Sequence, residues 1–380
     1  MIPYVQSIAC QQVPPPYHFP GVTVNAFIWE ASVTHIQAYC DEYFNLGDPL
    51  ERGFVYKAAA IWPYATLLVI DYPQMIATAN NVGPGWGTSY ADGGYVTQKE
   101  VFVALPLLRY GTRPETALWK AAIEWALPFI IVQNPMSSVC GREMLGLEKL
   151  LAEISLGEGE YPDAFSAAVK LPGWASLRPG EMQQNLPFLD VVTGPATPTI
   201  RGSAVQDSLW TLFSSNVVGQ TIGALGGVSN LIDALSAGLT PTAMQTVSLK
   251  QIRDAADPRR ALHQSLISCR SKYSNMENFK FYNENDVKIT IHDRGSFSEV
   301  FRVALNLPQV EDRFSTKDRP LSFTPAAAFR FNATIDFDQM RTLHTFQVDQ
   351  GPGLPPAAGN DDMMSPWLRP LRGFFGRPRT

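Results

Sequence analysis

The stretch SSVCGREMLGLEKLLAEI, residues 137–154, matters most for interpreting this chain, because it sets one lysine among leucines. Its only basic residues are Arg142 and Lys149. The leucines around Lys149 are Leu145, Leu147, Leu150 and Leu151. Helix propensity favours a helix over residues 141–154, with the lysine pointing to solvent. The alternative is an amine held away from water and used for chemistry. The residues around Lys149 leave both interpretations open.

Composition limits the classes of protein to consider. The chain has 380 residues, of which 45% are hydrophobic and 17% charged, with a formal net charge of −5. This profile is typical of a globular protein with one large domain or two ordinary ones. The negative charge and the lack of a recognisable motif argue against a nucleic-acid partner.

The four cysteines have no CxxC spacing, which predicts reduced thiols rather than a disulfide framework. We find no secretory signal at the N-terminus and no run of 18 apolar residues, so we expect a cytoplasmic protein without a membrane span. The histidines are scattered, without HxH or HxxxH spacing, so we expect no metal site and no cofactor.

Alternating and apolar runs predict strands, and a few segments have helical composition. The expected strands are residues 22–32, 65–77, 99–110, 128–134, 286–293 and 327–337, and the expected helices include 34–45 and 115–127. Pro106 places the 99–110 strand near a sheet edge or a bulge. Because strands and helices do not alternate regularly, the pattern predicts an α+β fold with a largely antiparallel sheet or barrel.

The domain organisation predicted from the sequence has three parts. We expect an N-terminal arm at 1–21, one domain at 22–347, and a flexible, basic, Pro/Gly-rich tail at 348–380. Residues 205–240 interrupt the domain as an inserted helical hairpin that carries no lysine or arginine. A segment this apolar must be buried, so we expect it to form either a contact in a homo-oligomer, which we favour, or a lid.

With its GREMLGLEK stretch, residues 141–149, the chain resembles the acetoacetate decarboxylase superfamily. The family signature of Gly-Arg-Glu, a few mostly apolar residues and then a reactive lysine is matched by Gly141, Arg142 and Glu143, then MLGLE, then Lys149. The resemblance extends thinly over about 22–338 and implies an antiparallel β-barrel or cone with flanking helices. It also implies that Lys149 is the Schiff-base lysine.

The strand KEVFVALPLL resembles the family strand that carries an active-site glutamate, which here is Glu100 before Pro106. Asp71 stands where the family has a second carboxylate, and Tyr95 is a candidate proton donor. Together with Lys149, Glu100 and Asp71 are the expected catalytic residues. Tyr95, Arg142 and Glu143 are the expected substrate-binding residues.

The chain departs from the family pattern at three places. Leu150 replaces the second lysine, Glu148 replaces the proline before the reactive lysine, and no arginine stands near the start of the first strand to meet a substrate carboxylate. A lysine attacks a carbonyl only as a neutral amine, which needs desolvation or a nearby cation. Here the leucines favour the desolvation route, and Glu148 opposes it if it shares the pocket.

The sequence thus predicts a Schiff-base lyase that acts through Lys149 on an oxo acid or a larger oxo compound, by decarboxylation or by aldolase–dehydratase chemistry. Two alternatives stay open: a catalytically inactive family member that binds an apolar oxo ligand, and a structural or assembly protein.

Overall fold

The computed structural model describes residues 13–60, 64–79, 94–112, 122–174, 180–197, 242–292 and 320–346. The expected insertion at 205–240 and the tail at 348–380 lie outside these ranges. Within them the fold is α+β, as expected, with many strands and few helices. The helices are α1 (Val33–Tyr43), α2 (Pro49–Arg52) and α3 (Pro135–Glu143), together with the 3-10 turn η2 (Glu284–Asp286). No helix in this part of the chain is long and apolar enough to cross a membrane.

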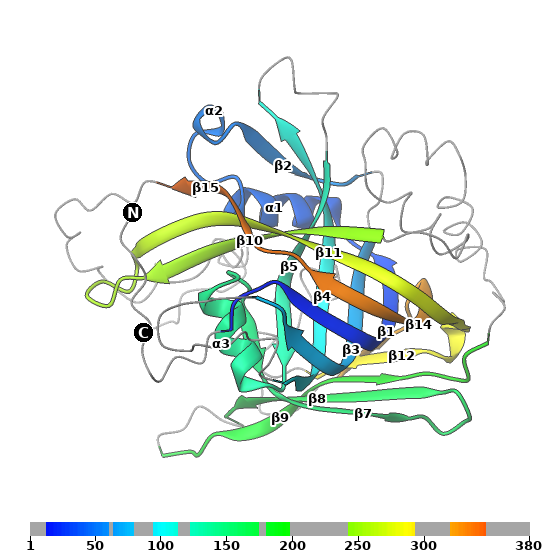
Figure 1. Cartoon of the computed structure of the whole chain (residues 1–380). Coiled ribbons are helices and arrows are strands. Elements are labelled where there is room, and N and C mark those ends of the chain that lie inside the picture. Colours follow the sequence, from blue (N-terminus) through cyan, green and yellow to red (C-terminus); the bar gives the residue numbers. More distant parts are fainter. Residues whose placement is uncertain are drawn as a thin grey trace, which may run out of the picture.

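A large sheet of ten strands dominates the structure (Figure 1). Its strands are β1 (Tyr17–Glu30), β2 (Phe54–Ala58), β3 (Tyr64–Ala77), β4 (Val96–Gly111), β5 (Ala122–Val132), β6 (Lys149–Leu151), β10 (Thr242–Arg253), β11 (Ala261–Tyr282), β14 (Ala327–Phe337) and β15 (Arg341–Phe346). A second sheet of five strands runs beneath it in the view of Figure 1. Its strands are β7 (Glu153–Glu158), β8 (Phe165–Gly173), β9 (Gln184–Val192), β12 (Lys288–Ile291) and β13 (Leu321–Phe323).

The large sheet curls back on itself. Pairing runs from β4 through β3, β1, β14, β11 and β10 to β5, and β5 pairs with β4 again. These pairs are antiparallel except for the short contact of β10 with β5, and β6 also joins β5 in parallel. The result is a barrel-like cone, in keeping with the expected architecture.

Side-chain alternation gives the sheet two different faces. On β3, Leu67 and Val69 belong to an outer core shared with α1 and the smaller sheet. Ile70 and Tyr72 belong to an inner core, made by residues from β1, β4, β5 and β14. The inner core is the one that surrounds the candidate site.

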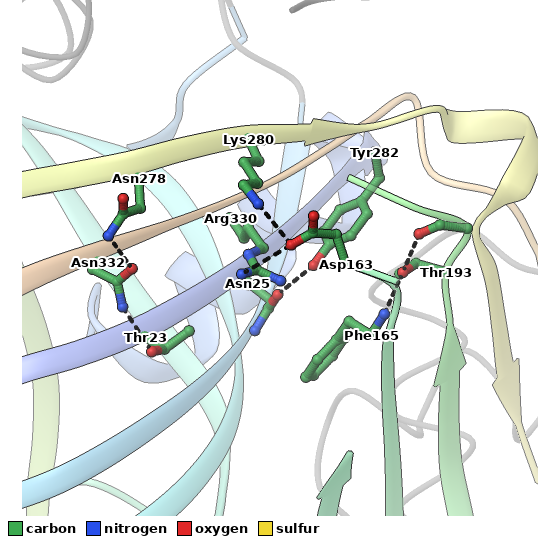
Figure 2. Close-up of polar contacts among 11 residues, drawn as sticks. Thr23, Asn25, Asp163, Phe165, Thr193, Asn278, Lys280, Tyr282, Arg330 and Asn332 are labelled. Atoms are coloured by element: carbon green, nitrogen blue, oxygen red, sulfur yellow. Dashed lines mark hydrogen bonds and ion pairs between the residues drawn. The ribbon is translucent and has the colours of Figure 1, made fainter. Parts of the chain in front are cut away.

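Polar contacts join the two sheets on the outer side of β1, β11 and β14 (Figure 2). Asp163, in the turn between β7 and β8, accepts a hydrogen bond from Lys280 Nζ at 2.6 Å and lies 3.9 Å from Arg330. The buried hydroxyl of Tyr282 donates to Asn25 Oδ1 at 2.8 Å. The Asp163 contacts hold the smaller sheet against the cone, and the Tyr282–Asn25 bond links β11 to β1 within the large sheet.

Two predicted helices are wrong. Residues 122–127, expected to be helical, lie in β5, where burial between β4 and β10 overrides their helical composition. The expected helix over 141–154 ends at Glu143, and strands β6 and β7 follow it. The next glycine explains the break: Gly146 has φ +61°, and a Cβ there would lie 2.8 Å from the backbone nitrogen of Lys250.

Two other expectations are refined by the structure. Strand β1 begins at Tyr17, inside the segment expected to be an arm, and pairs with β3 and β14. Strand β4 is paired on both sides, so it is no edge strand. Its pairing with β5 shifts register between Val103 and Leu105, next to Pro106, which is the bulge that the proline predicted.

Candidate active site

Lys149 lies in the wall of the inner cavity and is 7% exposed. Strand β6 places it there by pairing in parallel with β5, with Lys149 opposite Ile130. Because neighbouring residues on a strand point to opposite faces, Glu148 is exposed and Leu150 packs against the outer core. The glutamate that replaces the family's proline therefore does not share the pocket with the lysine.

Helix α3 shapes the space that the lysine side chain occupies. A Cβ on Gly141 would lie 2.5 Å from Lys149 Cδ and 2.8 Å from its Cε, closer than real atoms approach. The glycine of the Gly-Arg-Glu triplet is therefore needed because the lysine side chain lies directly on its Cα. The Gly141 carbonyl also accepts the Leu147 N–H at 2.9 Å, which fixes the loop that leads to β6.

The amine of Lys149 has two polar partners. Its Nζ lies 3.1 Å from Glu100 Oε2 and 3.0 Å from Ser137 Oγ. Glu100 is 7% exposed, and the same Oε2 accepts a hydrogen bond from Gln98 Nε2 at 2.5 Å. Gln98 Oε1 is buried and has no hydrogen-bond partner among the described residues. The contact expected between Glu100 and the Lys149 amine is thus present.

Local structure explains how these partners converge. Gln98 and Glu100 are two residues apart on β4, so both point to the inner face. Asn134 caps α3 by accepting hydrogen bonds from the backbone N–H groups of Met136 and Ser137, and Pro135 starts the helix. This cap places Ser137 in the first turn, facing the lysine.

The cavity has a volume of about 470 Å³ and a mostly apolar wall. Its apolar and aromatic lining includes Phe19, Met75, Phe102, Leu127, Ile130, Met136, Leu145, Leu147, Met244, Ile335 and Phe337. Its polar lining includes Tyr17, Tyr72, Tyr95, Glu100, Ser137, Cys140, Lys149, Thr246, Ser271 and Tyr273. A few polar groups gathered in an apolar hollow are typical of a small-molecule site.

Tyrosines add hydrogen-bond donors to this wall. Burial, and then the nearby Glu100 carboxylate, raise the pKa of Tyr273 to about 12. Burial, followed by Glu100 and Tyr273, also raises the pKa of Tyr72 well above its usual value. Both phenols therefore keep their protons at neutral pH. The Tyr273 hydroxyl donates to Met244 Sδ at 3.8 Å, and a thioether is a weak acceptor.

The structure brings half of the predicted site residues together. Lys149, Glu100 and Tyr95 line the cavity, and Tyr95, 58% exposed, does so at the solvent side.

Asp71, Arg142 and Glu143 are not among the described residues that line the cavity. Asp71 is half-buried and shares the face of β3 that carries Val69 of the outer core, because strand alternation turns it away from the cavity. Arg142 and Glu143 are exposed at the end of α3. Arg142 Nη1 instead donates to the backbone carbonyl of Lys149 at 3.3 Å, so it supports the strand that carries the lysine.

Several residues of the site were not predicted from the sequence. Gln98 could have been found from strand alternation, since it precedes Glu100 by two positions. Ser137 could not, because its approach to Lys149 depends on how α3 packs over β6. Within the described ranges, no three His, Cys, Asp or Glu side chains are grouped so that they could hold a metal ion.

Comparisons with known proteins identify the fold. No family model matches the chain, and no curated protein matches it. Among solved structures, acetoacetate decarboxylase from Legionella pneumophila subsp. pneumophila str. Philadelphia 1 superposes with a TM-score of 0.50 at 10% identity, covering 91% of this chain and 93% of that one.

Two further structures are similar at lower scores. An acetoacetate decarboxylase-like enzyme from Sphingomonas wittichii RW1 has a TM-score of 0.45 at 11% identity, covering 89% of this chain and 96% of that one. The enduracididine biosynthesis enzyme MppR has a TM-score of 0.45 at 11% identity, covering 88% of this chain and 90% of that one. The cone, the smaller sheet and the match over nearly the whole chain show that this protein has the acetoacetate decarboxylase fold in a divergent form.

Proposed function

We propose that the protein is a Schiff-base-forming lyase in which the Lys149 amine attacks the carbonyl carbon of an oxo compound. The observation that carries the proposal is a buried amine, 3.1 Å from the Glu100 carboxylate and 3.0 Å from the Ser137 hydroxyl, in the wall of a 470 Å³ apolar cavity. A buried ion pair is weak evidence for a stabilising role, and ionisable groups held away from water in a cavity are candidates for a functional site. The fold, shared with an enzyme named acetoacetate decarboxylase, supports the same reaction class.

In this proposal each group has a role that its contacts support. Glu100 accepts a proton from Lys149, which frees the nitrogen lone pair for attack on the carbonyl carbon. A C–N bond forms, and the carbonyl oxygen becomes a hydroxyl. Glu100 returns its proton to that hydroxyl, which leaves as water, and an imine remains. Gln98 holds the carboxylate through its amide N–H.

The imine then acts as an electron sink. When a bond to the carbon next to it breaks, the electron pair moves onto the imine nitrogen as an enamine. Protonation of that carbon and attack by water release the product and regenerate the amine. The Ser137 hydroxyl oxygen, which accepts a hydrogen bond from Lys149 Nζ, orients the amine before attack.

Borohydride trapping tests this function. The protein is incubated with a carbonyl compound such as 4-phenylbutan-2-one, reduced with sodium borohydride, and examined by intact and peptide mass spectrometry. We expect a stable adduct on the peptide that contains Lys149, and none in Lys149→Met. Arginine in place of Lys149 also abolishes the adduct, because a guanidinium forms no imine. A wild-type protein that binds the ketone yet never forms the adduct refutes the proposal.

That last result would identify the second candidate, a ligand-binding protein without chemistry. One observation favours it: Glu100 and Ser137 already satisfy two of the three N–H donors of Lys149, as in a structural buried lysine. Saturable binding of an apolar carbonyl compound that forms no adduct in the wild type and is unaffected by Lys149→Met would support this function and exclude the lyase.

A further inference from the structure

We infer that the compound bound by this cavity is a neutral, largely apolar aldehyde or ketone with no carboxylate. The inference rests on the Schiff-base role proposed above and deepens it. Its basis is the charge and the chemistry of the cavity wall.

The described part of the wall offers no unpaired cation to a carboxylate. Among its described residues the only formally charged side chains are Glu100 and Lys149, which pair with each other at 3.1 Å. Two segments next to the wall in sequence, 1–12 and 80–93, contain no lysine, arginine or histidine. Arg142 is exposed and donates to a backbone carbonyl, so it does not serve the cavity.

A carboxylate on the substrate would therefore be buried beside Glu100 without a partner. Once Lys149 has become an imine, its nitrogen carries at most the single positive charge that Glu100 already balances. A second carboxylate in such a site has to be desolvated and is repelled by the first. Binding of a neutral carbonyl compound incurs neither the desolvation of a carboxylate nor the repulsion by Glu100.

The size and lining of the cavity indicate what the rest of the molecule is like. About 470 Å³ is within the range of pockets that hold drug-sized ligands, and a small oxo acid would leave most of it empty. Aromatic rings and flexible thioethers line it, with Phe102, Phe337, Met75, Met136 and Met244 among them. Such walls suit an aromatic or long alkyl body.

One hydrogen-bond donor in the wall suits a neutral oxygen. The Tyr273 hydroxyl donates to the weak acceptor Met244 Sδ, so a hydroxyl or carbonyl oxygen of a ligand is a better partner. A compound without a carboxylate cannot be decarboxylated.

Because decarboxylation is excluded for such a compound, the reaction that remains is an aldol cleavage. A β-hydroxy ketone forms the imine with Lys149, and its Cα–Cβ bond then breaks. The hydroxyl proton goes to Glu100, an aldehyde leaves, and the electron pair moves onto the imine nitrogen. Glu100 gives this proton to Cα, which turns the enamine back into the imine, and water then hydrolyses the imine to release the ketone and the Lys149 amine.

A matched pair of ligands tests the inference. In 4-phenylbutan-2-one and 2-oxo-4-phenylbutanoate the phenylethyl body and the carbonyl are the same, and a methyl group replaces the carboxylate. Each compound is titrated into the wild-type protein by calorimetry, and in parallel with borohydride followed by mass spectrometry. Met136→Arg, which adds a cation to the wall, is measured with the same pair, and Met75→Lys takes its place if that variant fails to fold.

We expect the neutral ketone to bind at least ten times more tightly than the oxo acid, and the preference to shrink or reverse in the variant with the added cation. Equal or tighter binding of the oxo acid by the wild type overturns the inference, whether or not an adduct forms. The Schiff-base proposal is judged separately, by the adduct on Lys149. If the ketone binds preferentially but forms no adduct, the assignment of a neutral ligand is supported and the Schiff-base reaction is refuted.

Discussion

The contact between Gly141 and Lys149 yields the sharpest prediction. In the Gly141→Ala variant the new methyl group would lie 2.5 Å from Lys149 Cδ, 2.8 Å from Cε and 2.9 Å from Cγ. Ordinary contact between carbon atoms needs roughly 3.5–4.0 Å, so a shift of about 1 Å is required. Helix α3 is fixed by its Asn134 cap and by the bond from Leu147 N–H to the Gly141 carbonyl, so the lysine side chain has to move.

The size of the effect follows from this shift. Overpacking by one methyl group costs about 1–3 kcal/mol of stability, which a chain of this size tolerates. The reaction is affected more, since a displacement of about 1 Å of a reacting group lowers the rate roughly 100-fold. Moving Lys149 also breaks the contacts of Nζ with Glu100 and Ser137. We therefore expect a folded protein with a much slower trapping reaction.

The assay compares the rate of borohydride-trapped adduct formation in wild type, Gly141→Ala and Gly157→Ala. Gly157 is a suitable control because it is an exposed β7 glycine whose added Cβ would approach only Ser166 Oγ, at 3.2 Å. Circular dichroism and thermal melts monitor the fold of each variant. If Gly141→Ala traps the ketone as fast as wild type does, the lysine is not confined as described and the assignment of Gly141 is refuted.

Three other predictions concern the same site and the buried thiols. Lys149→Met leaves Glu100 buried without its cation and should lower the free energy of unfolding, measured by denaturant titration, by about 3–5 kcal/mol. Adding Glu100→Gln should recover most of this loss of stability, and no recovery would mean that the two residues are uncoupled. Ser137→Ala should slow adduct formation by about tenfold while Ser138→Ala does not, and equal rates would remove Ser137 from the site. Burial, with a smaller effect of Asp338, raises the pKa of the Cys269 thiol from 9.0 to about 12. The unfolded chain then loses this proton first as pH rises, so stability should fall by up to about 1.4 kcal/mol per pH unit from 9 towards 12, and Cys269→Ala should flatten that slope.

The buried lysine and its carboxylate partner could be predicted from the sequence because short motifs fix them. The Gly-Arg-Glu triplet before Lys149, and Glu100 before Pro106, are local patterns that do not depend on how distant segments pack. The strands at 22–32, 65–77 and 99–110 were found for a similar reason, since strand alternation is visible in the sequence itself.

The predictions that were wrong or missing concern features that depend on tertiary contacts. Residues 122–127 and 147–154 have helical composition, yet pairing with neighbouring strands overrides it. Asp71 was matched to the family's second carboxylate by sequence register alone. A register shift of one residue on a strand moves every side chain to the opposite face of the sheet. Ser137 was missed because only the packing of α3 over β6 brings it to the amine.

The change from helix to strand at Lys149 is also what makes the site possible. On a helix, the lysine would have shared its surface with residues three and four positions away, and the leucines would have lined one stripe. In the structure Lys149 on β6 lines the cavity, while Glu148, just before the strand, faces solvent and Leu150 packs against the outer core. The exposed carboxylate stays away from the amine, and among the residues that the structure describes the only carboxylate that reaches it is Glu100 from β4. Leu150 stands where the family has a second lysine, so the amine has one carboxylate and one hydroxyl as its partners among the described residues. A site whose described lining holds one balanced pair and no further cation suits a neutral carbonyl compound better than an oxo acid.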